Sequence, residues 1–285
     1  MNKKELSANA AGNFSLGGEI SVHRLGFGAM RLTGEGIWGP PKNRKAALAV
    51  LRRAVELDIN FIDTADSYGP HVSEELIAEA LFPYPDDLVI ATKAGLTRSG
   101  PNAWNADGRP EHIREAIEGS LRRLRLDAIE LYQLHAVDPK VPYTETVGAF
   151  RELQQAGLLR HVGVSNVSVE QLGVARGIVE VVSVQNRYNL TDRASEPVLQ
   201  GCARDGLAFI PWFPLATGRL AGDAIDRVAQ RRGLTPTQVG LAWLLHHSPA
   251  MLPIPGTSKV SHLEENVAAA EVELTAEDIR ELEAA

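Results

Sequence analysis

Eight short apolar runs, each followed by a segment with helical periodicity, constrain the fold of this chain more than any other feature. The runs are rich in Val, Ile, Leu and Phe and begin at Leu25, Ile59, Leu88, Ile129, His161, Val181, Ala208 and Met251. The helical segments cover residues 44–57, 73–81, 111–125, 143–156, 168–179, 195–204, 236–246 and 260–270. Alternating strands and helices are typical of a parallel sheet covered on its faces, and eight such units close a barrel. The sequence therefore predicts α/β architecture, with one (β/α)8 TIM barrel domain over residues 1–285.

Two further segments lie outside the eightfold pattern. Residues 14–22 predict a small β-hairpin that turns at Gly17 and Gly18 and closes the barrel floor. Residues 275–283 predict one more helix after the last unit. The 285 residues, of which 44% are hydrophobic, supply a core large enough for such a barrel without a linker.

Composition argues against several classes of protein. A net charge of −7 disfavours a general nucleic-acid binder, and the basic run at 122–127 is interpreted as the solvated end of an amphipathic helix. The chain has no uncharged apolar stretch of about 18 residues, and its first residues lack the apolar core of a signal peptide. Cys202 has no partner within the chain and is interpreted as a buried free thiol. We expect a soluble cytoplasmic protein without nucleic-acid or membrane partners.

Polar residues suited to carbonyl reduction occur at the ends of three successive predicted strands. Asp63, Lys93 and His135 end the second, third and fourth strands, and Tyr68 lies on the loop after Asp63. Chemistry in such barrels gathers where strands end and loops begin. Reduction of a carbonyl needs a hydride at carbon and a proton at oxygen, and a tyrosine stays protonated at neutral pH while a nearby ammonium eases its deprotonation. Singly, these residues could be an ion pair, loop packing and a buried histidine, but their conjunction favours an active site.

The motifs IDTADSY, IATKAG and LYQLHAVD, which contain these four residues, resemble those of the aldo/keto reductase family. The resemblance extends from LGFGAM at Leu25 to GTSKVSHLEEN at Gly256. It implies an NADP-dependent enzyme that reduces aldehydes or ketones to alcohols. In this interpretation Tyr68 donates the proton, Lys93 supplies positive charge and Asp63 fixes the lysine. His135 orients the carbonyl, which requires a neutral imidazole that donates a hydrogen bond.

The expected cofactor site lacks a Rossmann glycine triad, because GFGAMR has an arginine in place of the third glycine. Residues 254–266 instead offer a glycine turn, two hydroxyls and a lysine before a helix, although an ordinary capped turn is an alternative interpretation. The resemblance assigns them to the adenosine end of NADPH. The full set of implied cofactor contacts is Gly28, Ala29, Met30, Asp63, Ser165, Asn166, Gln185, Trp212, Phe213, Pro214, Leu215, Gly218, Arg219, Gly256, Thr257, Ser258, Lys259, His262, Glu265 and Asn266.

Two positions depart from the family pattern. His262 stands where members often carry an arginine, and Ala216 replaces a glycine near the pyrophosphate loop. A guanidinium binds a 2′-phosphate better than a neutral imidazole, although Lys259 offers a replacement charge. We expect NADPH to be preferred, with NADH bound more weakly.

Two tryptophans in the expected catalytic loops suggest the class of substrate. Trp38 and Trp104 are predicted to line the substrate pocket with Tyr68 and His135, and aromatic walls favour planar or apolar carbonyls. Packing of the loops is the alternative role for both tryptophans. The segments GPP, YGPH and PGTS are similar to a bacterial branch that includes pyridoxal reductases, which points to reduction of pyridoxal to pyridoxine.

Two other classes of function are alternatives to a reductase. A nucleotide-sensing barrel with little turnover is the alternative that an intact tetrad leaves open. A metal-dependent hydrolase is disfavoured, because the adjacent His246 and His247 point in different directions on a helix. The sequence predicts no metal site, and it leaves the oligomeric state open.

Overall fold

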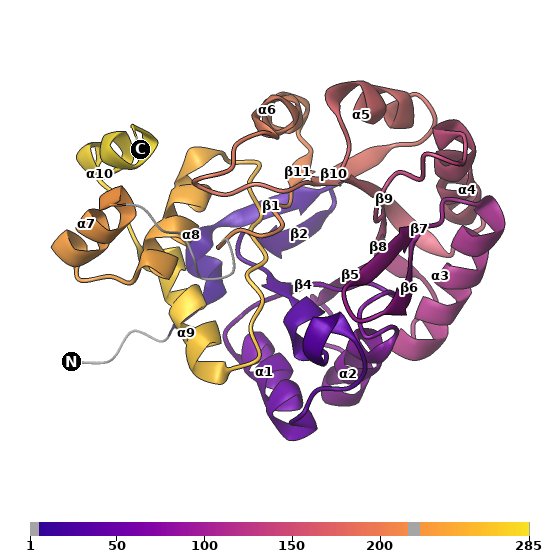
Figure 1. Ribbon diagram of the computed structural model, residues 1–285, viewed down its shortest axis with the longest axis horizontal. Helices are drawn as coiled ribbons and strands as arrows, with labels where there is room; N and C mark the ends of the chain where they lie inside the picture. Colours follow the sequence, from indigo (N-terminus) through magenta and orange to yellow (C-terminus); the bar gives the residue numbers. More distant parts are fainter. Residues whose placement is uncertain (1–5, 216–222, 285) are drawn as a thin grey trace.

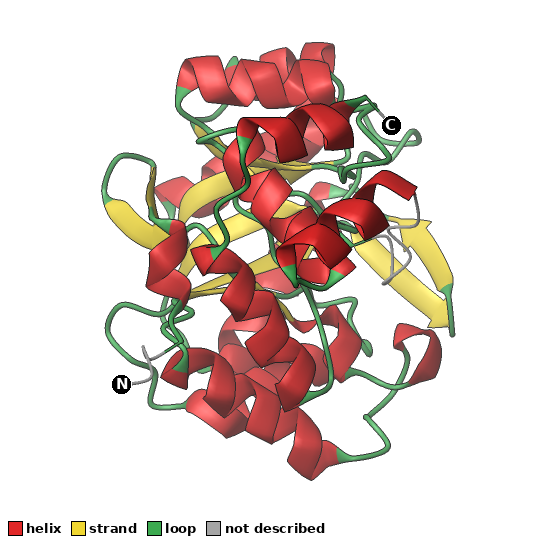
Figure 2. Cartoon of the chain, turned by 90° about the vertical axis from the view of Figure 1, so that its left-hand side faces the viewer, coloured by secondary structure: helices red, strands yellow, loops and turns green. Residues whose placement is uncertain are grey.

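The computed structural model, which describes residues 6–215 and 223–284, has the expected α/β barrel (Figure 1). One parallel sheet curls around the centre in the strand order β11-β10-β9-β8-β5-β4-β3. Its strands are β3 (Phe27–Gly28), β4 (Phe61–Asp63), β5 (Val89–Ala94), β8 (Ile129–Leu134), β9 (Leu159–Ser165), β10 (Val181–Gln185) and β11 (Ala208–Phe209). In the side view of Figure 2 the strands run through the middle of the molecule between the helices.

Residues 250–254 occupy the eighth strand position, although they form a single bridge rather than a regular strand. Met251 pairs in parallel with Phe209, and Leu252 N donates to Phe209 O at 2.9 Å. On the other side, Gly26 N donates to Pro253 O at 3.0 Å, so the segment closes the barrel against the start of β3. Pro253 and Pro255 have no amide hydrogen, and a regular ladder therefore cannot continue along this segment.

Helices surround the sheet, as the periodicity predicted (Figure 1). The eight expected helices are α1 (Arg44–Glu56), α2 (Val72–Leu81), α3 (Pro110–Leu124), α4 (Tyr143–Gln155), α5 (Val169–Arg176), α6 (Glu196–Asp205), α8 (Pro236–His247) and α9 (Val260–Ala268). Short 3-10 turns are η1 (Ala8–Ala11), η2 (Ala29–Leu32), η3 (Glu35–Ile37) and η5 (Ala269–Glu271). The expected extra helix is α10 (Ala276–Glu283).

Helix α7 (Asp223–Arg232) has no counterpart among the helices expected from the sequence. Its buried Ile225 and Val228 are spaced as on one face of a helix, so the signal was present. The expected pattern of one helix after each strand has no position for α7. The helix packs beside α10 (Figure 1), and Arg231 forms an ion pair with Asp278 at 2.6 Å.

The predicted amino-terminal hairpin consists of β1 (Asn13–Leu16) and β2 (Ile20–His23). Gly17 and Gly18 turn the chain with positive φ angles, as expected. A Cβ on Gly17 would lie 2.4 Å from the His161 ring, so a larger residue does not fit there. Leu16 and Val22 are buried in one apolar cluster with strand residues from the barrel interior, which places the hairpin at the barrel floor.

A second hairpin, which the sequence analysis treated as a loop, follows β5. It consists of β6 (Leu96–Gly100) and β7 (Ala103–Ala106) and carries Trp104. Cys202 is buried as expected, and this burial raises the pKa of its thiol to about 12. Within the part of the chain that the structure describes, no helix has the length and apolar content needed to cross a membrane.

Candidate active site

Three parallel strands bring the predicted tetrad together. Asp63 is the last residue of β4, Lys93 lies near the end of the neighbouring β5, and His135 directly follows β8. Tyr68 comes from the loop between β4 and α2. Each of the four side chains is buried. The expected convergence at the carboxyl end of the barrel is therefore present in the structure.

Lys93 and Asp63 form a buried ion pair beneath Tyr68. Lys93 Nζ donates to Asp63 Oδ1 at 2.6 Å and to the carbonyl oxygen of Thr64 at 2.8 Å. The same nitrogen lies 5.2 Å from the centroid of the Tyr68 ring. Burial lowers the pKa of Lys93, and the charge of Asp63 opposes that shift. The lysine is thus a fixed cationic donor under the tyrosine.

Two glutamines hold the other carboxylate oxygen of Asp63. Gln133 Nε2 donates to Asp63 Oδ2 at 3.0 Å, and Gln185 Nε2 donates to it at 2.8 Å. Gln185 was predicted to contact the cofactor, whereas Gln133 was not singled out from the sequence. The available signal was an amide side chain within a mostly apolar strand, where a buried polar group needs a hydrogen-bond partner. Gln133 therefore fixes the ion pair from β8.

Tyr68 and His135 face one another as neutral groups. Their rings make an edge-to-face contact with centroids 5.7 Å apart, and Ser67 Oγ lies 3.3 Å from His135 Nδ1. Burial, assisted by the charges of Asp63 and Asp66, holds the pKa of Tyr68 well above its ordinary value. Burial also holds the pKa of His135 well below its ordinary value, and Lys93 and Arg98 add to this shift. At neutral pH the tyrosine keeps its proton, and the imidazole has one N–H to donate.

An aromatic wall stands beside these two residues. The Trp104 ring centroid lies 6.3 Å from that of Tyr68 and 6.2 Å from that of His135. Arg98 stacks on Trp104, with 3.7 Å from its guanidinium carbon to the ring centroid, and lies 5.8 Å from the Trp38 ring. Both tryptophans are therefore on the catalytic side of the barrel. Arg98 was not among the site residues predicted from the sequence.

Several of the expected cofactor contacts lie next to the tetrad. Asn166 Nδ2 donates to the carbonyl oxygen of His135 at 2.9 Å, and Trp212 Nε1 donates to Asn166 Oδ1 at 2.9 Å. Ser165 Oγ donates to the Gln185 carbonyl oxygen at 2.6 Å. Phe213, Pro214 and Leu215 continue the chain after Trp212, whereas Ala216, Gly218 and Arg219 lie outside the described residues.

Gly28, one of the expected cofactor contacts, meets residues 254–266 by close backbone approach. A Cβ on Gly28 would lie 2.6 Å from the carbonyl oxygen of Ile254, and one on Gly256 would lie 2.5 Å from that of Gly28. Glycine is therefore required at both positions. Ala29 follows in the same turn, and Met30 packs against a cluster that includes Tyr68. The close approach joins the first βα loop to the last one.

The start of α9 has the donors that a phosphate group needs. Thr257 Oγ1 accepts from Lys259 N at 3.2 Å, and Lys259 immediately precedes the helix. Ser258, Lys259 and His262 are exposed. Hydroxyls, an ammonium and a helix amino terminus together suit an anionic ligand, so the residues present fit the adenosine end of NADPH.

The last two residues of this segment are placed differently. Asn266 is buried, and Glu265 Oε1 accepts from Thr235 Oγ1 at 2.7 Å. Thr235 caps helix α8, so Glu265 also connects α8 to α9.

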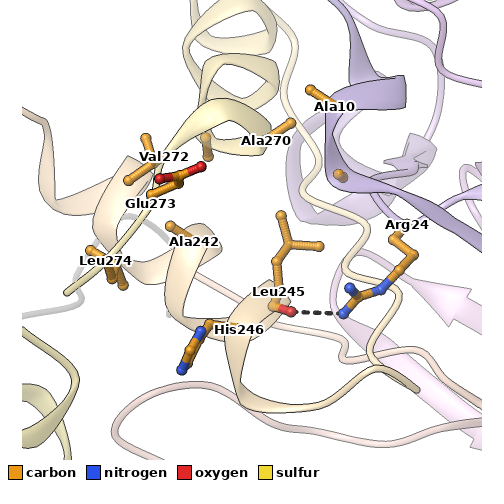
Figure 3. Close-up of a pocket in the computed structure, with 11 residues that line it drawn as sticks. Ala10, Arg24, Ala242, Leu245, His246, Ala270, Val272, Glu273 and Leu274 are labelled. Atoms are coloured by element: carbon orange, nitrogen blue, oxygen red, sulfur yellow. Dashed lines mark hydrogen bonds between the residues drawn. The ribbon is translucent and has the colours of Figure 1, made fainter. Parts of the chain in front are cut away.

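A hollow of about 380 Å³ lies away from the tetrad, between η1, α8 and residues 269–274 (Figure 3). Arg24 borders it but donates to the carbonyl oxygens of Leu245 at 2.7 Å, Ser248 at 2.6 Å and Met251 at 3.2 Å. Much of the remaining lining is alanine. Arg24 thus stabilises the carboxyl end of α8, and the hollow lacks the chemistry of the tetrad site.

The barrel and the tetrad at its carboxyl end define an aldo/keto reductase site. The model of the aldo/keto reductase family matches residues 24–285, and the chain belongs to that family. It is an NADP-dependent oxidoreductase acting on small-molecule carbonyl compounds.

Individual relatives agree with this assignment. The chain is 50% identical to an uncharacterized oxidoreductase of Schizosaccharomyces pombe over 98% of this chain and 91% of that one. It is 43% identical to pyridoxine 4-dehydrogenase of Escherichia coli over 96% of this chain and 98% of the relative. A crystal structure of an aldo/keto reductase from Klebsiella pneumoniae with NADP and acetate is 27% identical, with a TM-score of 0.81 over 95% of this chain and 94% of that one.

Within the described ranges, no group of three or more His, Cys, Asp or Glu side chains is arranged to hold a metal ion.

Proposed function

We propose that the chain reduces aromatic aldehydes to alcohols with NADPH, with pyridoxal as the leading substrate and Tyr68 as the proton donor. The observation that carries this proposal is the buried Lys93–Asp63 pair under Tyr68, opposite His135. An ion pair with a purely structural role would not need a tyrosine and a neutral histidine that converge on one point above it.

Each tetrad residue has a distinct part in the proposed reaction. NADPH, when bound, supplies the hydride to the carbonyl carbon. His135 donates a hydrogen bond to the carbonyl oxygen and orients it, and Tyr68 transfers its proton to that oxygen as negative charge develops. Lys93 stabilises the tyrosinate that remains, because its ammonium lies under the ring. Asp63 and the two glutamines hold the lysine in that position.

The choice of substrate rests on the aromatic wall and on one relative. Trp104 stands at the edge of both Tyr68 and His135, so a planar ring would pack there while its carbonyl reaches the tetrad. The E. coli relative is named pyridoxine 4-dehydrogenase, and its 43% identity covers almost the whole chain. These two observations support pyridoxal and similar aromatic aldehydes as substrates.

We extend the proposal to the cofactor contacts. Ser165, Asn166, Gln185 and Trp212 would hold the nicotinamide end, because they surround the tetrad. Residues 256–266 would hold the adenosine end. We also propose that residues 1–285 form one domain and that the protein is cytoplasmic.

The experiment that tests the proposal measures NADPH oxidation with a panel of carbonyl compounds. The panel contains pyridoxal, 4-nitrobenzaldehyde and phenanthrenequinone, and each is run with NADH as well. We expect turnover of aromatic aldehydes with NADPH, and a matched Tyr68→Phe control with almost none. Tight NADPH binding without turnover of any compound would contradict the proposal and favour a nucleotide-sensing barrel.

A further inference from the structure

Arg98 on β6 uses its whole guanidinium to bind backbone carbonyls. Its Nε donates to the oxygen of Ala103 at 2.8 Å. One terminal nitrogen donates to Ile37 at 2.7 Å and Ser67 at 3.1 Å, and the other to Gly36 at 2.8 Å and Gly100 at 3.2 Å. These contacts match the five N–H donors of an arginine. The side chain therefore has no N–H left for an anionic substrate.

The five carbonyls come from three separate segments around the active site. Gly36 and Ile37 belong to η3 beside Trp38, Ser67 precedes the catalytic Tyr68, and Gly100 and Ala103 belong to the β6–β7 hairpin. Arg98 thus connects the loop after β3, the loop after β4 and the hairpin after β5. Backbone hydrogen bonds also join the η3 segment to its neighbours, from Asn102 N to Gly36 O at 2.9 Å and from Gly39 N to Gly69 O at 2.6 Å. The guanidinium adds one point at which all three segments are bound together.

The backbone that Arg98 binds is strained at Ile37. Ile37 has a φ of 56°, in the left-handed region that a β-branched residue rarely adopts, and Gly36 has a φ of 68°. Such a conformation persists only when surrounding contacts hold it. Arg98 supplies one hydrogen bond to each of these two carbonyls. It therefore helps to hold the strained turn that leads into Trp38.

Arg98 also fixes the position of the aromatic wall. Its guanidinium lies 3.7 Å from the centroid of the Trp104 ring, a stacking distance, while the hairpin that carries Trp104 is held at Gly100 and Ala103. Trp104 in turn contacts Tyr68 and His135 by edge-to-face packing. Trp104 is 36% exposed, so part of its side chain is open to solvent.

We propose that Arg98 is a positioning residue that sets specificity for aromatic carbonyl substrates by holding Trp104 and Trp38 beside the tetrad. This inference rests on the proposed carbonyl reduction and adds a residue that decides which substrates bind well. A large planar substrate needs the wall in place, whereas a small aliphatic aldehyde reaches Tyr68 and His135 without it. Arg98 does not itself touch the reacting atoms.

The test compares Arg98→Lys and Arg98→Met with the full-length wild type. Lysine keeps the charge but lacks the planar fork, and methionine removes both. Steady-state kinetics are measured with 4-nitrobenzaldehyde and with propanal. Because a displacement of about 1 Å costs up to about 100-fold, we expect kcat/KM for the aromatic aldehyde to fall at least about tenfold in both variants, mainly through KM. For propanal we expect kcat/KM to change less than about threefold, since the wall makes no contact with so small a substrate.

Three measurements separate positioning from other roles. NADPH affinity should be unchanged, which also shows that the variants are folded. Arg109→Met is the matched control, because the Arg109 guanidinium binds Asp107 just after the same hairpin rather than the carbonyls that Arg98 binds. The fall of kcat/KM on the acid side of its pH profile should stay unchanged in Arg98→Lys, because the lysine keeps a cation near His135.

Trp104→Ala gives a second, independent check. It should show the same selective loss, and adding Arg98→Met to it should cost little more, because the arginine acts through the tryptophan. Equal losses for both aldehydes, wild-type kinetics in Arg98→Lys, or additive losses in the double variant would overturn the inference. A wild type that reduces neither these two aldehydes nor pyridoxal would instead overturn the proposed function.

Discussion

Replacement of Lys93 by methionine tests both the stability and the chemistry of the tetrad. The side chains of Lys93 and Asp63 are 0% and 2% exposed, and Lys93→Met leaves the carboxylate buried without its cation. Removing one member of a buried pair costs about 3–5 kcal/mol. Gln133 and Gln185 still donate to Asp63 Oδ2, which solvates part of the remaining charge. We therefore expect a loss near the lower limit, about 3 kcal/mol in free energy of unfolding.

Urea denaturation followed by tryptophan fluorescence measures this loss. With a slope of about 3 kcal/mol per molar urea, the midpoint should fall by about 1 M. The double variant Asp63→Asn with Lys93→Met should recover part of the loss, because it removes the unpaired charge. Carbonyl reduction should be lost in both variants, since neither has an ammonium under Tyr68.

The control for this prediction is Arg114→Met. Arg114 pairs with Glu152 at 2.6 Å, but the two side chains are 44% and 54% exposed, so the expected cost is about 0–1 kcal/mol. A midpoint shift for Lys93→Met no larger than that for Arg114→Met would refute the reasoning. It would mean that the carboxylate is held by the glutamines alone.

Three further predictions concern single residues. Tyr68→Phe should lower kcat by about 100-fold or more while NADPH affinity stays within about twofold, because the hydroxyl gives the proton but does not hold the cofactor; retention of more than about a tenth of wild-type turnover would remove Tyr68 as the acid. Lys259→Ala should weaken NADPH binding, measured by fluorescence titration, far more than NADH binding, and equal losses would show that Lys259 does not contact the 2′-phosphate. The lowered pKa of His135 means that the unfolded chain binds its proton first as pH falls below about 6.5, so wild-type stability should decline there by up to about 1.4 kcal/mol per pH unit relative to His135→Gln. The raised pKa of Asp66 has the opposite effect, because it makes the folded protein more stable as pH falls. The comparison with His135→Gln cancels this contribution, since both proteins contain Asp66. Identical pH profiles of stability would contradict the assignment of a neutral His135.

Strand and helix positions could be predicted well because each βα unit carries its own local signal. Apolar runs mark β5 and β8, and the periodic apolar residues of α3 mark its buried face. At the end of α3, Arg122 is exposed as expected, whereas Arg123 donates to the buried Glu74 at 2.6 Å, so the predicted solvated end is only partly present. The prediction was weakest for residues 250–254, where the apolar run predicted a regular strand. Prolines interrupt the backbone hydrogen bonds there, and a single bridge forms instead. The prediction also passed over α7, because the repeat was counted in units of one strand and one helix.

The identity of the tetrad could be predicted because strand ends of one barrel meet at one rim. Asp63, Lys93 and His135 are far apart in the chain but adjacent once parallel strands pair in register. The network that supports them could not be predicted in the same way. Gln133 is one amide within an apolar strand, and nothing local shows that it binds Asp63.

The sequence by itself determined the alternating architecture, the order of the catalytic residues and the family resemblance, since these depend on residue type and spacing along the chain. Only the tertiary structure decided which carbonyls Arg98 binds, how Trp104 stands against Tyr68 and His135, and which groups are neutral. The five carbonyls on Arg98 come from segments up to 62 positions away from it in sequence. Such contacts depend on how loops meet in space, and the pKa values depend on burial that no local pattern specifies.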